Sequence, residues 1–473
     1  MRRLTAALGL LIVVTSTFAA GRAPDPRCWT VDTADGAVGQ CDAEGTFHTL
    51  GVTAFEPTMG AAPDGSLYYA TTPRGGVAVG FGAGISASRD GGQTWEDVTP
   101  EIAGQYIPPE TNDPYAYVDP FTGRAFAFHM GPILTCSILS WTDDGGQTWD
   151  FNPVGCAPTG VWDHQTMVAA PPTDGTTTLG YPNVLVSCVN AIYAAECGRS
   201  LDGGRTWQHT VPVHLNTDVA TEGCGAQHGH LASDTSGFIY LPTSQCGKNP
   251  AVYISRNSGL TWEPSIINEM DMPFEDPAVQ VDAEGTIYAS WHDNLGQLWF
   301  ATSRDVGATW SGALRITPPQ VVSLLPTMVV GDPGHIAIFF AGTDDRAFLV
   351  DDGSEDFEVE AEEVAWGAYV TYATNANAGA PMFTTIDTTG DDPIMRGDVC
   401  PIEGRCTYQI DFIGSTITPD GQIFGSLIDG CLQECVEDEE RGNDVAGTGW
   451  AIVATVPGLD LCAETCPKFP VAS

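Results

Sequence analysis

The chain has 473 residues and a formal net charge of −42 at pH 7, with 60 acidic against 18 basic side chains. A surface this acidic repels nucleic acid and anionic membranes, so we exclude both as partners. An anionic ligand would need a locally basic pocket. No motif requires a cofactor and no loop matches a complete EF-hand, although calcium would suit an acidic surface rich in oxygen ligands.

The first twenty residues predict an export signal. Arg2 and Arg3 precede a short apolar run from Leu8 to Val14, and small residues at positions 19 and 20 suit a cleavage site. An uncleaved N-terminal anchor is the alternative. No later stretch approaches about 18 consecutive apolar residues, so we expect no membrane span after cleavage. Residues 21–50 are expected to form an N-terminal extension.

Fourteen cysteines favour an oxidising, extracellular compartment, because an even number at short spacings predicts disulfides. The spacings suggest pairs of Cys28 with Cys41, Cys136 with Cys156, Cys188 with Cys197, Cys224 with Cys246, and Cys400 with Cys406. Cys431, Cys435, Cys462 and Cys466 are expected to pair among themselves. Zinc is the alternative for these four, since their spacing resembles that of metal ligands.

Five segments share a turn pattern that ends in tryptophan. They are SRDGGQTW from Ser88, TDDGGQTW from Thr142, SLDGGRTW from Ser200, SRNSGLTW from Ser255 and SRDVGATW from Ser303. The aspartate (asparagine in the fourth copy) can accept backbone N–H bonds within a tight turn, and glycine permits a positive φ. The copies recur every 48 to 58 residues, near the roughly 40–50 residues of one four-stranded propeller blade.

A second repeat consists of a short strand, a turn of the Asp-Gly type and another strand. We interpret it as the hairpin between the first two strands of a blade. Its seven copies begin at Glu56, Asp113, Asp163, His228, Glu275, Leu325 and Asp411. We therefore predict an all-β fold: a single β-propeller of seven four-stranded antiparallel blades, with six blades as the alternative.

The propeller is expected to occupy residues 51–457, and a cysteine-containing tail, 458–473, to follow it. The strand from Trp450 to Val456 is the candidate to finish the last blade. The N-terminal segment near Cys28 to Thr33 is the candidate to join it there. Such closure would protect strand edges.

The five turns resemble the Asp-box, or BNR, repeat of sialidase-like propellers. Segments such as DPYAYVDPFTGRAF from Asp113 and DPAVQVDAEGTIYASW from Asp276 are similar to secreted exo-α-sialidase-like proteins. The resemblance implies that the Asp boxes lie on the periphery, away from the ligand face. It also implies a carboxylate clamp of three arginines and a Tyr–Glu nucleophile, but the arginine motif expected near the N-terminus is absent.

Ligands of propellers usually meet the central channel, so the starts of the innermost strands are the places to search. A ring of carboxylates there could hold a protonated acid beside an ionised base, as glycoside hydrolysis requires. The candidate catalytic residues are Asp163, Glu56, Glu275, Asp276 and Asp411. The candidate substrate-binding residues are His164, His228, His230, Arg124 and Arg396.

Other interpretations of the same residues stay open. His164, His228 and His230 with a carboxylate could bind a metal, or all these groups could satisfy backbone ends near the channel. Tyr115 is a candidate nucleophile by its chemistry only. We expect a monomer, secreted or at the cell surface, that acts on or binds extracellular carbohydrate or glycoprotein. An exo-glycosidase is one hypothesis, and a non-catalytic propeller for protein, glycan or metal binding is the alternative.

Overall fold

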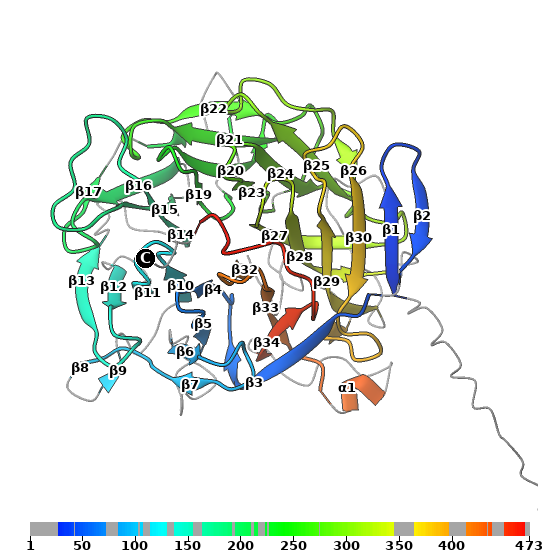
Figure 1. Ribbon diagram of the computed structural model, residues 1–473, viewed down its shortest axis with the longest axis horizontal. Coiled ribbons are helices and arrows are strands. Elements are labelled where there is room, and N and C mark those ends of the chain that lie inside the picture. Colours follow the sequence, from blue (N-terminus) through cyan, green and yellow to red (C-terminus); the bar gives the residue numbers. More distant parts are fainter. Residues whose placement is uncertain are drawn as a thin grey trace, which may run out of the picture.

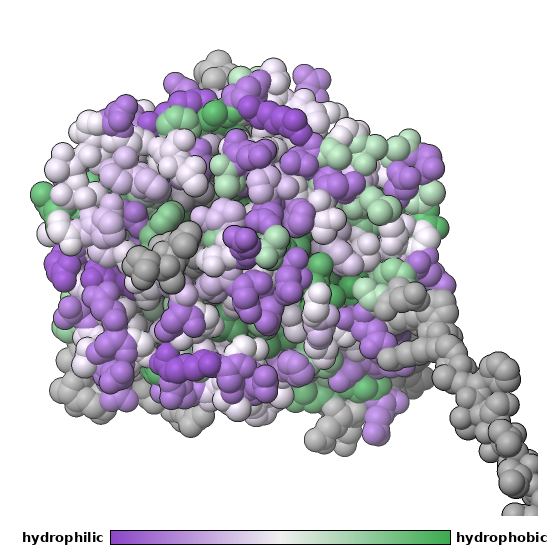
Figure 2. Space-filling view, in the orientation of Figure 1, coloured by the Kyte–Doolittle hydropathy of each residue, from purple (hydrophilic) through white to green (hydrophobic). Residues whose placement is uncertain are grey.

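In the computed structural model, antiparallel sheets follow one another around a central axis, as the blades of a propeller do (Figure 1). The face viewed there is mostly hydrophilic, with scattered hydrophobic residues (Figure 2). The structure describes residues 27–468 except 42, 72–83, 103–104, 107–113, 130–136, 155–162, 192–193, 210–211, 216–222, 225–226, 274, 345–363, 397–412, 433 and 438–448.

Seven four-stranded blades make up the ring, each an antiparallel meander that runs from an inner to an outer strand. Blades 1 to 3 are β4 (Met59–Ala61), β5 (Leu67–Thr71), β6 (Gly84–Ser88), β7 (Glu96–Asp97); β10 (Pro114–Val118), β11 (Ala125–His129), β12 (Ser137–Thr142), β13 (Asp150–Val154); and β14 (Asp163–Ala170), β15 (Val184–Ala191), β16 (Ala194–Ser200), β17 (Gln208–His209).

Blades 4 to 7 continue the ring. They are β19 (Ala232–Ser233), β20 (Ile239–Cys246), β21 (Asn249–Ser255), β22 (Glu263–Ile266); β23 (Ala278–Val281), β24 (Ile287–His292), β25 (Leu298–Ser303), β26 (Leu314–Arg315); β27 (Val322–Val330), β28 (Ile336–Thr343), β29 (Ala365–Ala373), β30 (Met382–Asp387); and β32 (Gly414–Ile417), β33 (Ile423–Asp429), β34 (Gly449–Thr455), β3 (Thr46–Ala54). The predicted seven blades are confirmed.

The remaining elements attach to this ring. Two strands extend the outer edge of blade 6, where β1 (Cys28–Asp32) pairs with β30 and β2 (Ala37–Gln40) pairs with β1. The others are the hairpin β8 (Glu101–Ile102) and β9 (Gln105–Tyr106), β18 (His214–Leu215) beside β16, β31 (Met395–Arg396) beside β29, and the helix α1 (Glu434–Glu437). Among the described residues no helix is long and apolar enough to cross a membrane.

The ring is closed by strands from the two ends of the chain. β34 is the third strand of blade 7, and β3 pairs with it as the fourth, from Thr46 opposite Thr455 to Ala54 opposite Gly449. β3 therefore performs the closing role that we assigned to the segment near Cys28, whereas β1 extends blade 6. The residues that we predicted to form an N-terminal extension, 21–50, thus contribute β1, β2 and most of β3 to the sheets.

The hydrophobic core lies between neighbouring blades. Tyr68 and Ile85 of blade 1, for example, pack with Val118 of blade 2, and the far side of blade 2 packs Phe126 against Leu185 of blade 3. The second strands of the blades, such as β5, β15, β24 and β28, are buried almost throughout, whereas outer strands such as β7, β17 and β22 are half-buried or exposed.

The Asp boxes are turns between the third and fourth strands of blades 1 to 5. In the first copy the carboxylate of Asp90 accepts bonds from the backbone N–H and the hydroxyl of Thr94, at 2.9 and 2.6 Å. These bonds lower the pKa of Asp90 to about 2. Gly92 adopts φ 84°, where a side chain would be strained. Arg89 reaches the next box and donates to the Gly145 carbonyl, which links successive blades.

Five of the expected disulfides are present in the described residues: Cys28–Cys41, Cys188–Cys197, Cys224–Cys246, Cys431–Cys435 and Cys462–Cys466. The last two show that the four C-terminal cysteines pair among themselves, so the zinc alternative is wrong for them. The predicted Cys136–Cys156 and Cys400–Cys406 pairs lie outside the described residues.

Candidate functional site

The inner strands of the blades line a central channel with a cavity of about 180 Å³. At one end, which we call the channel mouth, the inner strands begin, with Tyr115, His230 and Asp276 on the wall. At the other end, the Asp-box end, the hairpin turns and the Asp boxes lie together. They share that end because the first and third turns of a four-stranded meander fall on the same side.

At the channel mouth the backbone of three inner strands is strained. Glu56, His164 and Leu325 all have positive φ, at 46°, 59° and 54°. In blades 3 and 6 this coincides with a break in the pairing of the inner strand with its neighbour, around His164 and Leu325. Left-handed non-glycine residues cost about 1–3 kcal/mol each and concentrate at functional sites. The bulge at His164 re-aims its imidazole away from the ladder.

His164 is the centre of a buried hydrogen-bonded chain that joins three blades. The side-chain amide of Gln227 donates to His164 Nδ1 at 3.2 Å, and His164 Nε2 donates to Asp276 Oδ2 at 2.7 Å. The amide fixes the tautomer, because Nδ1 must accept and Nε2 must therefore carry the proton. Asp276 is 4% exposed, and its second oxygen, Oδ1, has no hydrogen-bond partner among the described residues.

His228 adds a second acceptor beside this chain. Its ring lies edge-on to that of His164, with centroids 5.4 Å apart, and it is fully buried. Burial, and then the neighbouring His164, hold the pKa of His228 well below its usual range, so the ring is neutral. Its Nδ1 donates to the Gly229 carbonyl at 3.3 Å, which leaves Nε2 as an acceptor without a partner among the described residues.

Tyr115 and His230 form a second network that crosses the channel. The Tyr115 hydroxyl lies 3.2 Å from Thr166 Oγ1 and 3.4 Å from His230 Nδ1, and His230 Nε2 donates to the Ile413 carbonyl at 2.9 Å. These contacts join blades 2, 3, 4 and 7. Burial raises the pKa of Tyr115 to about 12, so its phenol is protonated at neutral pH. That state disfavours Tyr115 as a nucleophile.

The structure brings only some of the predicted residues together. His230 and Asp276 line the cavity at the channel mouth, His164 contacts Asp276 and His228, and Glu275 lies half-buried next to Asp276. Glu56 is buried just before β4. Asp163 begins β14, but its side chain lies outside the described residues, as does all of Asp411.

The two predicted substrate-binding arginines do not join this group. Arg124 lies at the turn of blade 2, at the Asp-box end, where it forms a two-pronged pair with Asp143 and donates to the Gly203 carbonyl. Arg396 is buried and donates to the Cys435 carbonyl at 2.8 Å. Each guanidinium is thus used to hold the fold, so these two do not make a carboxylate clamp.

The described residues contain no group of three or more His, Cys, Asp or Glu side chains arranged to hold a metal ion. His164 contacts the Gln227 amide and the Asp276 carboxylate, His228 contacts the Gly229 carbonyl, and His230 contacts the Tyr115 hydroxyl and the Ile413 carbonyl. The calcium prediction remains untested. Gln227 was not among the candidates, although its place beside His228 in the sequence was the available signal.

Comparisons with known proteins give distant structural resemblances. No family model and no curated protein matches the sequence. A Hadza microbial sialidase is 20% identical, with 64% of this chain and 67% of that chain covered at a TM-score of 0.44. A protein of unknown function from Dyadobacter fermentans is 14% identical, and the match covers 91% of this chain and 100% of that chain at a TM-score of 0.43. The endosialidase of phage phi92 is 11% identical, and the match covers 91% of this chain and 71% of that chain at a TM-score of 0.46.

Proposed function

We propose that this protein is a secreted, glycan-directed propeller that binds an uncharged carbohydrate at the channel mouth. The observation that carries the proposal is the buried pair of His164 and Asp276, which leaves Asp276 Oδ1 without a donor among the described residues. A buried acceptor without a partner costs about 1–3 kcal/mol, and a ligand hydroxyl would remove that cost. His228 Nε2 is a second buried acceptor without a partner among the described residues, although His228 does not itself line the cavity.

The chemistry of the site favours hydroxyl groups over anions. A fixed carboxylate oxygen on the cavity wall attracts hydrogen-bond donors and repels carboxylates. Asp276 is held by His164, and His164 by Gln227, so the acceptor geometry is set before a ligand arrives, which lowers the cost of binding. The five disulfide bridges of the described residues suit the extracellular compartment in which glycans occur.

The proposal is tested by glycan-array binding of the wild type, Asp276→Asn and Asp271→Asn. Replacing one carboxylate oxygen by an amide turns an acceptor into a donor, and we expect at least about a tenfold loss of affinity, or about 1.4 kcal/mol. Asp271 is exposed, so Asp271→Asn controls for the change in charge. Equal binding by all three proteins would refute the site.

Hydrolysis is the second candidate function, because Glu56 and Asp276 are both buried carboxylates at the starts of inner strands. Glycosidases need two such groups that flank the scissile bond. The glycans that bind are therefore also followed for release of sugar by mass spectrometry. Turnover that Asp276→Asn abolishes would assign hydrolysis, whereas binding without turnover assigns a lectin-like role.

A further inference from the structure

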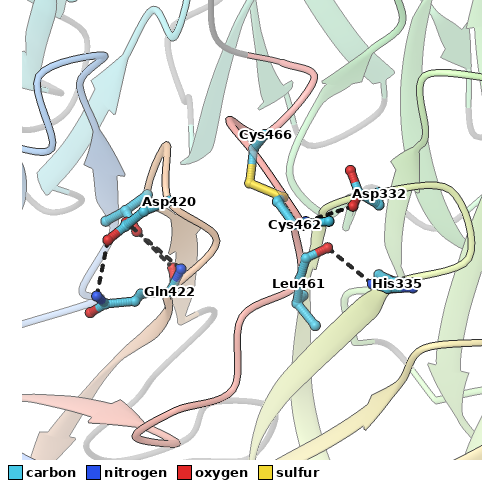
Figure 3. Close-up of a disulfide and its surroundings, with 9 residues drawn as sticks. Asp332, His335, Asp420, Gln422, Leu461, Cys462 and Cys466 are labelled. Atoms are coloured by element: carbon cyan, nitrogen blue, oxygen red, sulfur yellow. Dashed lines mark hydrogen bonds between the residues drawn. A yellow bond between two sulfur atoms is a disulfide. The ribbon is translucent and has the colours of Figure 1, made fainter.

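The C-terminal tail, residues 458–468, is packed into the ring rather than extending from it. Leu461 is fully buried in the core beside blades 6 and 7. Its carbonyl accepts bonds from the Asp332 N–H at 2.9 Å and from His335 Nδ1 at 3.1 Å. The Ala463 N–H in turn donates to the Asp332 carboxylate at 2.8 Å. The tail is therefore anchored to the hairpin turn of blade 6 (Figure 3).

The turn of blade 7 holds the other side of the tail. The Leu461 N–H donates to the Gly421 carbonyl at 3.0 Å, and the Cys466 N–H donates to the Pro419 carbonyl at 2.8 Å. The disulfide Cys462–Cys466 closes the loop between these two anchors (Figure 3).

Two glycines make room for this docking. A Cβ on Gly331 would lie 2.3 Å from the Leu461 carbonyl oxygen, and a Cβ on Gly421 would lie 2.8 Å from the Cys462 nitrogen. Both distances are too short for real contacts. The hairpin turns of blades 6 and 7 thus pack directly against the backbone of the tail, with no room for a side chain at either glycine.

Beyond the disulfide, the tail reaches the channel. Pro467 and Lys468 line the cavity together with the inner strands, and the C-terminal segment crosses the middle of the ring in Figure 1. The whole chain contains only two lysines, Lys248 and Lys468. Lys468 is the one lysine or arginine among the described residues that line the cavity. Lys468 as a whole is half-buried, and the burial of its amine lowers its pKa to about 8.

We propose that the C-terminal tail is a plug that closes the Asp-box end of the channel and encloses the Lys468 amine within it. The disulfide Cys462–Cys466 holds the plug in place, and ligands then reach the channel through the channel mouth alone. Reduction of the disulfide releases the plug and opens the second end. This inference goes beyond the proposed function and does not depend on it.

Acetylation of the two lysines tests the plug in the whole protein. Lys248 is exposed and serves as the internal reference, and peptide mass spectrometry follows both sites. At about pH 10, where a large share of exposed lysine is already neutral, we expect Lys468 to react at least about tenfold more slowly than Lys248. Replacing Cys462 and Cys466 by serine is expected to bring its rate close to that of Lys248.

A matched control is available in the second disulfide of the same spacing, Cys431–Cys435. Replacing both of its cysteines by serine is expected to leave Lys468 protected. If the Cys462/Cys466 variant does not fold, His335→Ala, which removes one anchor of Leu461, is expected to raise the Lys468 rate several-fold in the oxidised protein. Equal rates at the two lysines of the intact protein, or no change in these variants, would overturn the plug.

Discussion

Tyr69 connects the first blade to the last, and its hydroxyl can be removed without changing its shape. Tyr69 is fully buried in β5 of blade 1. Its hydroxyl donates to the Leu427 carbonyl at 2.7 Å and lies 3.0 Å from the Ile452 carbonyl, both in blade 7. Burial raises the pKa of Tyr69 well above its usual range, so the donor is present at any working pH.

We expect Tyr69→Phe to lower the free energy of unfolding by about 1–3 kcal/mol, because the one hydroxyl proton of Tyr69 is lost and a buried carbonyl of blade 7 is left short of a donor. Urea denaturation followed by circular dichroism measures this change, and the slope with urea should stay the same. Tyr372→Phe is the control: Tyr372 is half-buried in β29, and a change within about 0.5 kcal/mol is expected. A Tyr69→Phe effect as small as that of the control would refute the closing role of this hydroxyl.

Three further predictions concern stability. Burial lowers the pKa of His129 to about 3, below the value of about 6.5 in an unfolded chain. The stability that neutral His129 contributes is therefore lost as the pH falls from about 6.5 towards about 3, and His129→Leu should flatten the pH profile of the unfolding free energy over that range. Arg124→Lys loses the two-pronged pair with Asp143 and should cost about 1–2 kcal/mol, with glycan binding unchanged. Because the net charge is −42, raising NaCl from about 0.1 to 1 M should raise the urea midpoint by screening repulsion; an unchanged midpoint would contradict this.

The repeats made the fold predictable from sequence. Each Asp box combines an aspartate or asparagine, a glycine and a tryptophan, whose turn is local and needs no distant partner. The inner hairpins are local as well, so the number of blades followed from counting them. Ring closure was not predictable in the same way, because β1 and β3 are both N-terminal strands that precede the repeats. Which one pairs with β34 depends on contacts across the whole chain.

The site was predictable only in part, for the same reason. The starts of inner strands placed His164, His228 and Asp276 at one end of the channel. Their order of hydrogen bonding depends on the bulge at His164, which no local pattern reveals. Arg124 has the residue type of a substrate clamp, yet its position in a hairpin turn places it at the Asp-box end, where it pairs with Asp143.

The location of the ligand is the central claim, and hydrogen–deuterium exchange of the protein with a glycan selected on the array tests it most directly. We predict slower exchange in peptides that contain the channel mouth, at 163–168, 227–232 and 275–279. Exchange in the Asp-box peptides, such as 88–95 and 142–149, should not change. Protection of the Asp boxes with none at the channel mouth would contradict a ligand site at the channel mouth.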